Sequence, residues 1–268
     1  MKVGFIGVGN MGGALCKSIA SNTEIELLIS NHSVAKAEGL LSQLNHPSAQ
    51  LMDNEQIVAH SDFVFMGLKP AMMVSMLQQL TAVANPKLTW ISMAAGIELT
   101  ALTDAVGQQP VIRIMPNTPV EIGFGMTTYV ANEYVQSSNL KHFEAIMAPT
   151  GTVVALPESL MDAATAIAGC GPAFVYQMIE AMSDVGVKIG LPRYLAQQLT
   201  VQTLIGAAQM VEQTQKHPGA LKDAVTSPGG STIAGVTALE ANGFRHAAIE
   251  AVLKAFERTQ QLKEEKRG

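Results

Sequence analysis

Three glycines near the start of the chain form a pattern that suits a dinucleotide. The segment Gly7-Val8-Gly9-Asn10-Met11-Gly12 fits G-x-G-x-x-G, between an apolar run and the start of a helical pattern. In such a loop Gly7 permits a tight turn, Gly9 lets the backbone approach a pyrophosphate, and Gly12 allows the helix to pack closely on the strand. The N–H groups of the helix start favour phosphate. A glycine-rich turn without a ligand is the alternative, and the strand–turn–helix context favours the dinucleotide.

The end of the second predicted strand indicates which dinucleotide binds. NAD sites usually carry Asp or Glu there, about 20 residues after the glycines, to bind the ribose 2′-hydroxyl. Here the segment Ser30-Asn31-His32-Ser33 holds no carboxylate that would repel a 2′-phosphate. Ser30, Asn31 and Ser33 offer neutral donors instead. The sequence therefore predicts NADPH, with NADH possible in a site that tolerates both.

A second cluster of small and hydroxyl-bearing residues lies in the later half of the chain. Between Ser227 and Thr232 the sequence Ser-Pro-Gly-Gly-Ser-Thr precedes a helical pattern. Free N–H groups at such a helix start make a nest of the size of a carboxylate, surrounded by hydroxyls. A capped connection between two helices is the alternative. Two glycines and three hydroxyls in six residues exceed what capping requires.

The remaining residues with reactive or metal-binding side chains form no recognisable site. No spacing of His, Cys, Asp or Glu suggests a metal ion. The six histidines are scattered in loops or on helix surfaces, where we expect them to be solvated. Cys16 and Cys170 form neither a Cys-x-x-Cys pair nor a disulfide framework, which favours a reducing, cytoplasmic compartment.

The elements that must position these clusters follow from hydrophobic patterns. Over residues 1–156 apolar β-type runs alternate with helical stretches, and runs such as Phe63-Val64-Phe65-Met66 are continuously apolar, as expected of strands covered on both faces. Repeated β-α-β order predicts an α/β fold with a Rossmann-type, doubly wound, mostly parallel sheet. The eight predicted strands are Lys2–Gly7, Ile25–Ser30, Ala49–Met52, Asp62–Leu68, Leu88–Met93, Val111–Met115, Gly125–Ala131 and Thr152–Leu156.

The composition changes after Pro157, where no further strand-like run appears and Ala-, Leu- and Gln-rich helical patterns follow. We therefore predict a NADP-binding Rossmann domain over residues 1–156 and an all-helical domain over residues 157–268. Pro172, between two glycines, should break or bend the first helix of this domain.

Overall composition excludes several functional classes. The chain has 268 residues, 48% of them apolar, and a formal net charge of −5, so it can bury a substantial core. The acidic balance, with no Lys/Arg cluster before a charged terminus at Lys263–Gly268, argues against a nucleic-acid partner. No segment has the length of a membrane span, and no signal-peptide pattern is present. We expect a soluble protein with a small-molecule substrate.

Several segments together resemble the pyrroline-5-carboxylate reductase family. The resemblance extends from Met1 to about Lys263, and Thr-Ser-Pro-Gly-Gly at residues 226–230 is its most specific mark. It implies a NAD(P)H-dependent oxidoreductase of two domains, whose helical C-terminal domains interlock into a homodimer that can assemble further. The other segments that carry it are Leu68-Lys69-Pro70, Ala94-Ala95-Gly96, Arg113-Ile114-Met115-Pro116-Asn117-Thr118-Pro119, Cys170-Gly171-Pro172-Ala173-Phe174 and Gly186-Val187-Lys188-Ile189-Gly190-Leu191-Pro192.

The resemblance also implies roles for individual residues. Residues Ile6, Gly7, Val8, Gly9, Asn10 and Met11 would hold the pyrophosphate, and Asn54 would contact the adenosine side. The remaining cofactor contacts would be Gly67, Leu68, Lys69, Pro70, Met93, Ala94 and Ala95, although a solvated surface lysine would equally explain Lys69. The substrate contacts would be Ser227, Gly229, Gly230, Ser231 and Thr232.

The implied reaction is the reduction of the cyclic imine 1-pyrroline-5-carboxylate to L-proline. This reaction is the last step of proline biosynthesis, so the resemblance implies a role in amino-acid biosynthesis. The reduction needs a hydride on the C=N carbon and a proton on nitrogen, and holding the reactants together should supply most of the acceleration. The loop Gly229–Thr232 would bind the carboxylate, and the Thr232 hydroxyl would position the imine nitrogen. Since an alkanol is too weak an acid near pH 7, we expect Thr232 to position the substrate or relay a proton from water.

Two residues depart from the family pattern, and other functions remain as alternatives. The family usually has Ser at the place of Cys170, and some relatives have Asn at the place of Ala224. A reductase of another small imine or 2-oxo acid would fit the same two-domain plan. A β-hydroxyacid dehydrogenase would need a catalytic lysine, for which Lys188 is the candidate. A NADP-sensing protein without turnover is a third possibility.

Overall fold

The computed structural model describes residues 1–264. Residues 265–268, part of the charged terminus noted in the sequence, lie outside the described residues. Internal contacts divide the chain into two compact units, one of Met1–Cys170 with the end of the last helix from Phe256, and one of Gly171–Ala255. The domain assignment to residues 1–156 and 157–268 remains a prediction.

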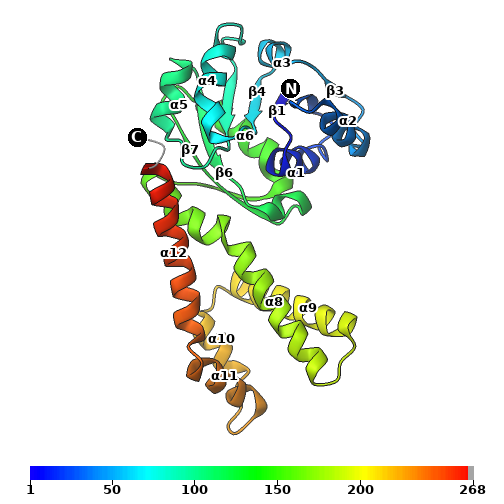
Figure 1. The fold of residues 1–268 in the computed structure, drawn as a ribbon, viewed down its shortest axis with the longest axis vertical. Helices are drawn as coiled ribbons and strands as arrows, with labels where there is room; N and C mark the ends of the chain where they lie inside the picture. Colours follow the sequence, from blue (N-terminus) through cyan, green and yellow to red (C-terminus); the bar gives the residue numbers. More distant parts are fainter. Residues whose placement is uncertain (265–268) are drawn as a thin grey trace. The chain divides into compact units, whose positions relative to one another are not determined.

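The first unit contains one eight-stranded sheet in the order β3-β2-β1-β4-β5-β6-β7-β8 (Figure 1). Neighbouring strands are parallel except for the antiparallel pair β6 and β7. All eight predicted strands are present with ends shifted by at most two residues, which confirms the mostly parallel, doubly wound sheet. The strands are β1 (Lys2–Ile6), β2 (Glu26–Ser30), β3 (Ala49–Leu51), β4 (Phe63–Met66), β5 (Thr89–Ser92), β6 (Val111–Met115), β7 (Gly125–Ala131) and β8 (Gly151–Ala155).

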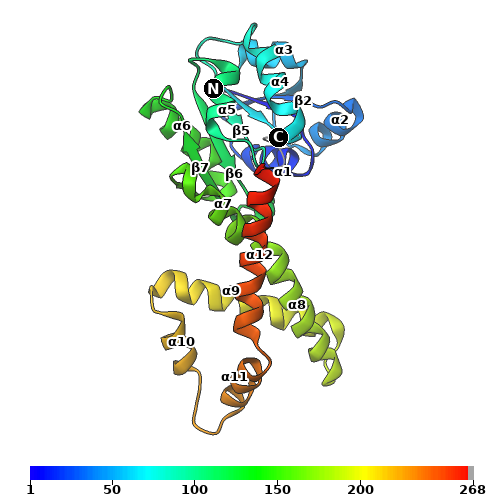
Figure 2. The same ribbon diagram turned by 60° about the vertical axis from the view of Figure 1, so that its left-hand side comes forward.

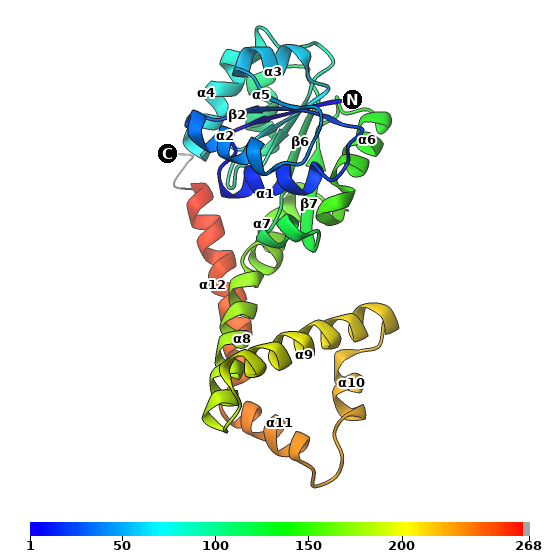
Figure 3. The ribbon, with the colours of Figure 1, turned by 90° about the vertical axis from the view of Figure 1, so that its right-hand side faces the viewer.

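Helices cover both faces of this sheet, which explains the continuously apolar strands (Figure 3). Phe5 and Phe65 face one side, where their rings stack with centroids 4.8 Å apart, and the next residue, Met66, faces the other. The first face is covered by α1 (Asn10–Ile19), α2 (Val34–Gln43) and α6 (Ser137–Met147), and the second by α3 (Asn54–His60), α4 (Pro70–Thr81) and α5 (Leu99–Val106).

Short elements complete the first unit. The turns η1 (Thr118–Ile122) and η2 (Ala148–Thr150) come before β7 and β8, and β8 is followed by η3 (Glu158–Leu160), α7 (Met161–Ala164) and the π-helical turn η4 (Thr165–Gly169). The following helix restarts at Gly171 with Pro172 as its second residue, so the predicted break at this proline is confirmed. Proline fits there because the first turn of a helix needs no N–H donor.

The second unit is entirely helical among the described residues, as the sequence predicted. Figure 2 shows its long and short helices. They are α8 (Gly171–Lys188), α9 (Arg193–Thr214), α10 (Pro218–Ala224), α11 (Ser231–Ala241) and most of α12 (Phe244–Glu264). Within residues 1–264 no helix is both long enough and apolar enough to cross a membrane.

One histidine differs from the prediction that all six are solvated. His46 is buried, its Nδ1 accepts the N–H of Ser48 at 3.2 Å, and its Nε2 lies 3.3 Å from the Asn22 carbonyl oxygen. The prediction for His46 is therefore wrong, because the segment before β3 folds back on the segment before β2. Local polarity does not reveal such a contact between loops 24 residues apart.

Tyr129 on β7 is expected to make the stability of the fold depend on pH above 10. Burial, together with the hydrogen bond from its hydroxyl to Glu144 Oε1 at 2.7 Å and the charge of that carboxylate, raises the pKa of Tyr129 to about 12. The folded state therefore retains the proton longer than the unfolded state, whose phenol titrates near pH 10. This contribution is complete below pH 10 and is lost between about pH 10 and 12, a loss on the order of 2 kcal/mol.

Denaturant unfolding of the wild type and Tyr129→Phe at pH 8 and pH 11.5 measures this effect. The phenylalanine variant keeps the ring, which packs edge to face on Phe143 with centroids 5.1 Å apart, and removes the titrating group. We expect the stability of the wild type relative to the variant to fall with rising pH. A constant difference would contradict the assignment.

Candidate functional site

The glycine-rich loop between β1 and α1 has the geometry that a dinucleotide requires. Gly7 has φ of +90°, and its N–H donates to the Ser30 carbonyl oxygen at 2.9 Å. A Cβ on Gly12 would lie 2.2 Å from the Gly7 carbonyl oxygen, and a Cβ on Gly67 would lie 2.0 Å from the same atom. Gly12 therefore allows α1 to pack against the turn after β1, and Gly67 allows the loop after β4 to touch the same turn, at the point where the strand order reverses.

Gly9 differs from its neighbours because a Cβ there would meet no atom of the chain within 4 Å. Packing within the chain therefore does not require glycine, and the space beside its backbone is open. Gly9 is also the N-cap of α1, without a side-chain hydrogen bond to the cap and without an acidic residue in the first turn. The uncapped N–H groups and the positive end of the helix fit a pyrophosphate in that space.

The other predicted pyrophosphate residues surround this helix start. Ile6 and Val8 are buried, so they can contribute only backbone atoms, whereas Asn10 is exposed and Met11 half-buried. These residues present a continuous stretch of backbone at the carboxyl edge of the sheet. That edge is where ligands bind in open α/β sheets.

The structure joins the end of β2 to the glycine loop and to α3. The N–H of Val8 donates to Asn31 Oδ1 at 3.1 Å, and Asn31 Nδ2 donates to the Ser33 carbonyl oxygen at 3.1 Å. Ser30 Oγ donates to Asn54 Oδ1 at 2.7 Å, which leaves the Asn54 amide hydrogens for other partners. Ser30, Asn31 and Asn54 thus lie together, and the polar side-chain atoms of Asn31 are already paired with the chain itself.

The remaining predicted cofactor residues follow β4 and β5 at the same edge. Pro70 is the first residue of α4, as expected of a helix-starting proline, and Lys69 is the exposed N-cap before it. Gly67 and Leu68 are half-buried beside them. After β5, Met93, Ala94 and Ala95 lead into Gly96, whose φ of +74° turns the chain. Parallel strands place all these segments at one edge because their carboxyl ends coincide.

The predicted substrate loop belongs to the second unit and forms a tight turn. Gly229 has φ of +68°, and the Gly230 N–H donates to the Ser227 carbonyl oxygen at 3.1 Å. A Cβ on Gly230 would lie 2.5 Å from Ser227 Oγ, so a larger residue would displace that hydroxyl. Gly230 is the N-cap of α11 and provides no side-chain cap. The N–H groups of the first turn of α11, beside the exposed Ser231 and Thr232, therefore fit an anionic group such as a carboxylate.

One ion pair, between a buried arginine and a half-buried glutamate, was not predicted from the sequence. Arg113 Nη1 lies 2.6 Å from Glu158 Oε1, and the same oxygen accepts the N–H of Leu99 at 2.7 Å. Arg113 is only 5% exposed, so its charge needs such a partner. The signal was present in the sequence as an arginine within an apolar strand, but the identity of its partner was not. This pair joins β6 to the start of α5.

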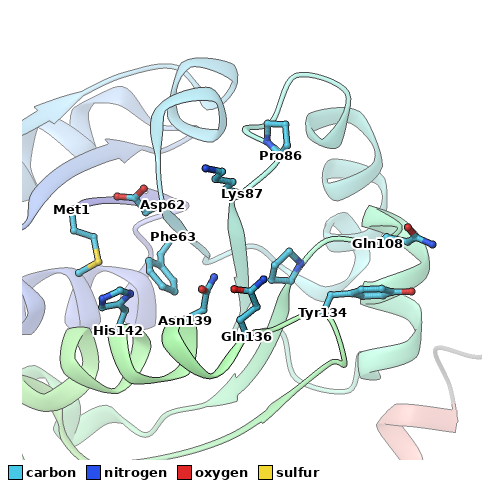
Figure 4. Close-up of a pocket in the computed structure, with 11 residues that line it drawn as sticks. Met1, Asp62, Phe63, Pro86, Lys87, Gln108, Tyr134, Gln136, Asn139 and His142 are labelled. Carbon is cyan, nitrogen blue, oxygen red and sulfur yellow. The ribbon is translucent and has the colours of Figure 1, made fainter.

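The first unit also has a cavity that lies away from the predicted site residues. At the amino ends of β4, β5 and β6 a cavity of about 690 Å³ contains none of the predicted site residues (Figure 4). It is lined by Met1, Asp62, Phe63, Pro86, Lys87, Gln108, Pro110, Tyr134, Gln136, Asn139 and His142. Among the residues described, no group of three or more His, Cys, Asp or Glu side chains is placed to hold a metal ion.

Comparisons with known proteins assign the family. A family model described as pyrroline-5-carboxylate reductase dimerisation matches residues 158–262, and one described as NADP oxidoreductase, coenzyme F420-dependent, matches residues 2–96. The pyrroline-5-carboxylate reductase of Synechocystis sp. is 41% identical over 265 residues, covering 98% of each chain. That of Escherichia coli is 35% identical, covering 97% of this chain and 98% of the relative.

Solved structures agree with the sequence relatives. Pyrroline carboxylate reductase of Plasmodium falciparum, solved with NADP bound, superposes with a TM-score of 0.86 at 33% identity, covering 98% of each chain. The enzyme from Streptococcus pyogenes gives 0.86 at 32% identity, covering 97% of this chain and 98% of the other. The resemblance noted in the sequence is thereby confirmed: the chain belongs to the pyrroline-5-carboxylate reductase family.

Proposed function

We propose that this chain reduces the imine 1-pyrroline-5-carboxylate to L-proline with NADPH, the last step of proline biosynthesis. The observation that carries the proposal is that a member of this family has two helix starts without a side-chain cap, each able to bind an anionic group. One is the open backbone at Gly9, which suits the pyrophosphate of a dinucleotide. The other is the uncapped start of α11 beside Ser231 and Thr232, which suits a carboxylate.

The first unit would hold the cofactor along the carboxyl edge of the sheet. The backbone from Ile6 to Met11 would bind the pyrophosphate, Asn54 the adenosine side, and Met93–Ala95 the nicotinamide end. When bound, the dihydronicotinamide supplies the hydride for the C=N carbon. A relative in Plasmodium falciparum was solved with NADP, which supports NADPH as the donor. NADH remains possible, since Ser30–Ser33 contains no group that would exclude it.

The second unit would orient the substrate. The N–H groups of Ser231 and Thr232, with the Ser227 and Ser231 hydroxyls, would bind the carboxylate and so fix the ring. The Thr232 hydroxyl would then hydrogen-bond the imine nitrogen. Since an aliphatic hydroxyl is a poor acid, the nitrogen receives its proton through water or arrives protonated, and Thr232 holds it in position. The rate gain comes mainly from this orientation.

We also infer a homodimer, from the apolar surface of the helical unit. Apolar residues occur on all sides of α11, yet none of its residues is buried within the described chain. Ile189 and Tyr194 are 75% and 73% exposed. A second copy of the chain that packs on α11 and around Ile189 and Tyr194 would bury these apolar side chains. Such dimers could assemble further. Cysteine usage and the acidic charge support a cytoplasmic protein without a membrane or nucleic-acid partner.

The direct test is the oxidation of NADPH with pyrroline-5-carboxylate, followed at the nicotinamide absorbance, with NADH in parallel. We expect rapid turnover with proline as the product, faster with NADPH than with NADH. Tight NADPH binding without turnover would overturn the substrate assignment. It would favour a different small imine or 2-oxo acid, or a cofactor-sensing protein.

A further inference from the structure

We propose that Glu158 is a positioning residue for hydride transfer. Its carboxylate would fix the loop between β5 and α5, residues 93–98, on which the nicotinamide end of the cofactor would rest. Glu158 is not among the predicted contacts of cofactor or substrate, so it would act through this loop. The inference rests on the proposed function, since it assumes that Met93–Ala95 meet the nicotinamide. It assigns a role to a residue for which the family assignment provides none.

The Glu158 carboxylate is held in place by a buried arginine. Arg113 Nη1 donates to Glu158 Oε1 at 2.6 Å. Ile112 and Ile114 pack in the core on the first face of the sheet, so Arg113, between them on β6, points to the second face, which α5 covers. A buried guanidinium without an acidic partner is costly. The arginine therefore keeps the carboxylate beside the start of α5.

The same carboxylate oxygen holds the first residue of α5. The Leu99 N–H donates to Glu158 Oε1 at 2.7 Å. The first N–H groups of a helix need acceptors from outside the helix, yet the N-cap of α5, Glu98, makes no side-chain hydrogen bond to the cap. The Glu98 carboxylate lies instead 2.8 Å from Lys263 Nζ. The acceptor for the start of α5 therefore comes from Glu158, 59 residues further along the chain.

The loop between β5 and α5 is thus held at both of its ends. At its start the Ala94 N–H donates to Ser92 Oγ at 3.4 Å, and Ala94 is buried. Ser92 is the last residue of β5 and lies opposite Arg113 on β6. Only residues 93–98 connect β5 to α5. A shift of Leu99 after loss of its hydrogen bond would therefore also move Met93–Ala95.

Hydride transfer is sensitive to such a shift. The reacting atoms must lie about 3–3.5 Å apart, and a misplacement of about 1 Å can lower the rate about a hundredfold. The adenosine end of the cofactor is expected beside Asn54 and the glycine loop, which do not belong to this segment. Loss of the Leu99–Glu158 bond should therefore slow the hydride step and leave binding of the adenosine end unchanged. A glutamate that only stabilised the fold would leave the hydride step unchanged.

Two variants of Leu99 separate the N–H group from the side chain. Leu99→Pro and Leu99→Ala both lose the leucine side chain, but only the proline variant loses the N–H donor. Proline is favoured at the first position of a helix. The residue before it, Glu98, has φ of −77° and ψ of 154°, the extended conformation that a residue before proline prefers. Both variants are assayed with NADPH and with NADPH deuterated at the transferred C4 hydrogen.

We expect kcat of Leu99→Pro to be about tenfold lower than that of Leu99→Ala. The deuterium isotope effect on kcat should be larger in Leu99→Pro, because the hydride step then limits turnover in place of product release. The affinity of both variants for adenosine 2′,5′-bisphosphate, which lacks the nicotinamide, should match that of the wild type. Equal kcat values and equal isotope effects in the two variants would overturn the inference.

Two variants of Glu158 give a second measurement, which does not depend on the folding of Leu99→Pro. Glu158→Gln keeps the length of the side chain and an oxygen acceptor but loses the charge. Glu158→Asp keeps the charge but is shorter by one CH₂ group, so one oxygen no longer reaches both donors. If Glu158 acts by positioning, kcat of the glutamine variant should exceed that of the aspartate variant by about three- to tenfold.

An ion pair that only stabilised the fold would favour aspartate over glutamine. A kcat of Glu158→Asp equal to or above that of Glu158→Gln would therefore overturn the inference. Glu121→Gln serves as the control, because it breaks the exposed ion pair between Lys17 Nζ and Glu121 Oε1, 3.0 Å apart, in the same unit. It should leave both kcat and the isotope effect unchanged.

Failure of the proposed function would look different. In that case the wild type itself would not oxidise NADPH in the presence of pyrroline-5-carboxylate. If the wild type turns over and the Leu99 and Glu158 variants differ from it only in thermal stability, the proposed function holds and Glu158 serves the fold alone.

Discussion

Gly9→Ala is expected to raise the dissociation constant for NADPH by about a hundredfold while the protein stays folded. A Cβ at residue 9 has free space within the chain, so the variant folds normally. The methyl group enters the space where the pyrophosphate would meet the start of α1, and it separates the phosphate from two N–H donors. Two charge-assisted hydrogen bonds of about 1.5 kcal/mol each correspond to this factor. Fluorescence titration with NADPH and thermal unfolding measure the two effects separately.

Two neighbouring glycines serve as controls for Gly9→Ala. A Cβ on Gly13 would lie 3.5 Å from the Val8 carbonyl oxygen, an ordinary contact, so Gly13→Ala should bind NADPH normally and stabilise the helix by about 0.5–1 kcal/mol. A Cβ on Gly12 would lie 2.2 Å from the Gly7 carbonyl oxygen, so Gly12→Ala should lose both binding and stability. Normal NADPH binding by Gly9→Ala would contradict the assignment of the pyrophosphate to this loop.

Thr232→Val is expected to lower kcat by about a hundredfold without changing the affinity for NADPH. The variant keeps the shape of the side chain and removes the hydroxyl that would position the imine nitrogen. Removing a single positioned hydrogen-bond partner from a reacting group typically costs this much in rate. Since Thr232 is not among the predicted cofactor contacts, NADPH binding should not respond. Steady-state kinetics and NADPH titration check both statements.

Two further variants test whether the Thr232 hydroxyl positions the substrate or only supports the fold. Thr232→Ser retains a hydroxyl and should recover most of kcat, whereas a purely structural threonine would not distinguish serine from valine in this way. Thr237 is exposed on the same helix, and Thr237→Val should leave kcat unchanged. If Thr232→Val turns over as fast as the wild type, the hydroxyl does not contact the reacting nitrogen.

Most of the fold could be predicted from the sequence because its signals are local. Apolar β-type runs predicted all eight strands within two residues of their observed ends, and the absence of such runs after Pro157 predicted the helical half. The helix start at Pro70 and the break at Pro172 followed from the missing N–H and fixed φ of proline. These properties depend on neighbours within one or two turns of chain, which a sequence displays directly.

The candidate site could be predicted only in part, because several of its contacts join residues that are far apart in the sequence. The pattern G-x-G-x-x-G identified the loop, but only the structure distinguishes Gly12, which packing requires, from Gly9, which it leaves open. The pairing of Ser30 with Asn54 joins residues 24 apart. That of Arg113 with Glu158 joins residues 45 apart, and the sequence showed only that the arginine needed a partner. The order of strands in the sheet decides such pairs.

The sequence by itself determined the fold class, the glycine loop, the absence of an acid after β2 and the family to which the chain belongs. Each of these is a matter of residue type and short-range spacing. Only the tertiary structure decided that the Asn31 side chain bonds to the Val8 N–H of the glycine loop and to the Ser33 carbonyl oxygen. It decided this because β2 and β1 pair in register, Ile6 against Ser30, and so place the two loops side by side. That register comes from packing of the whole sheet, and no local pattern encodes it.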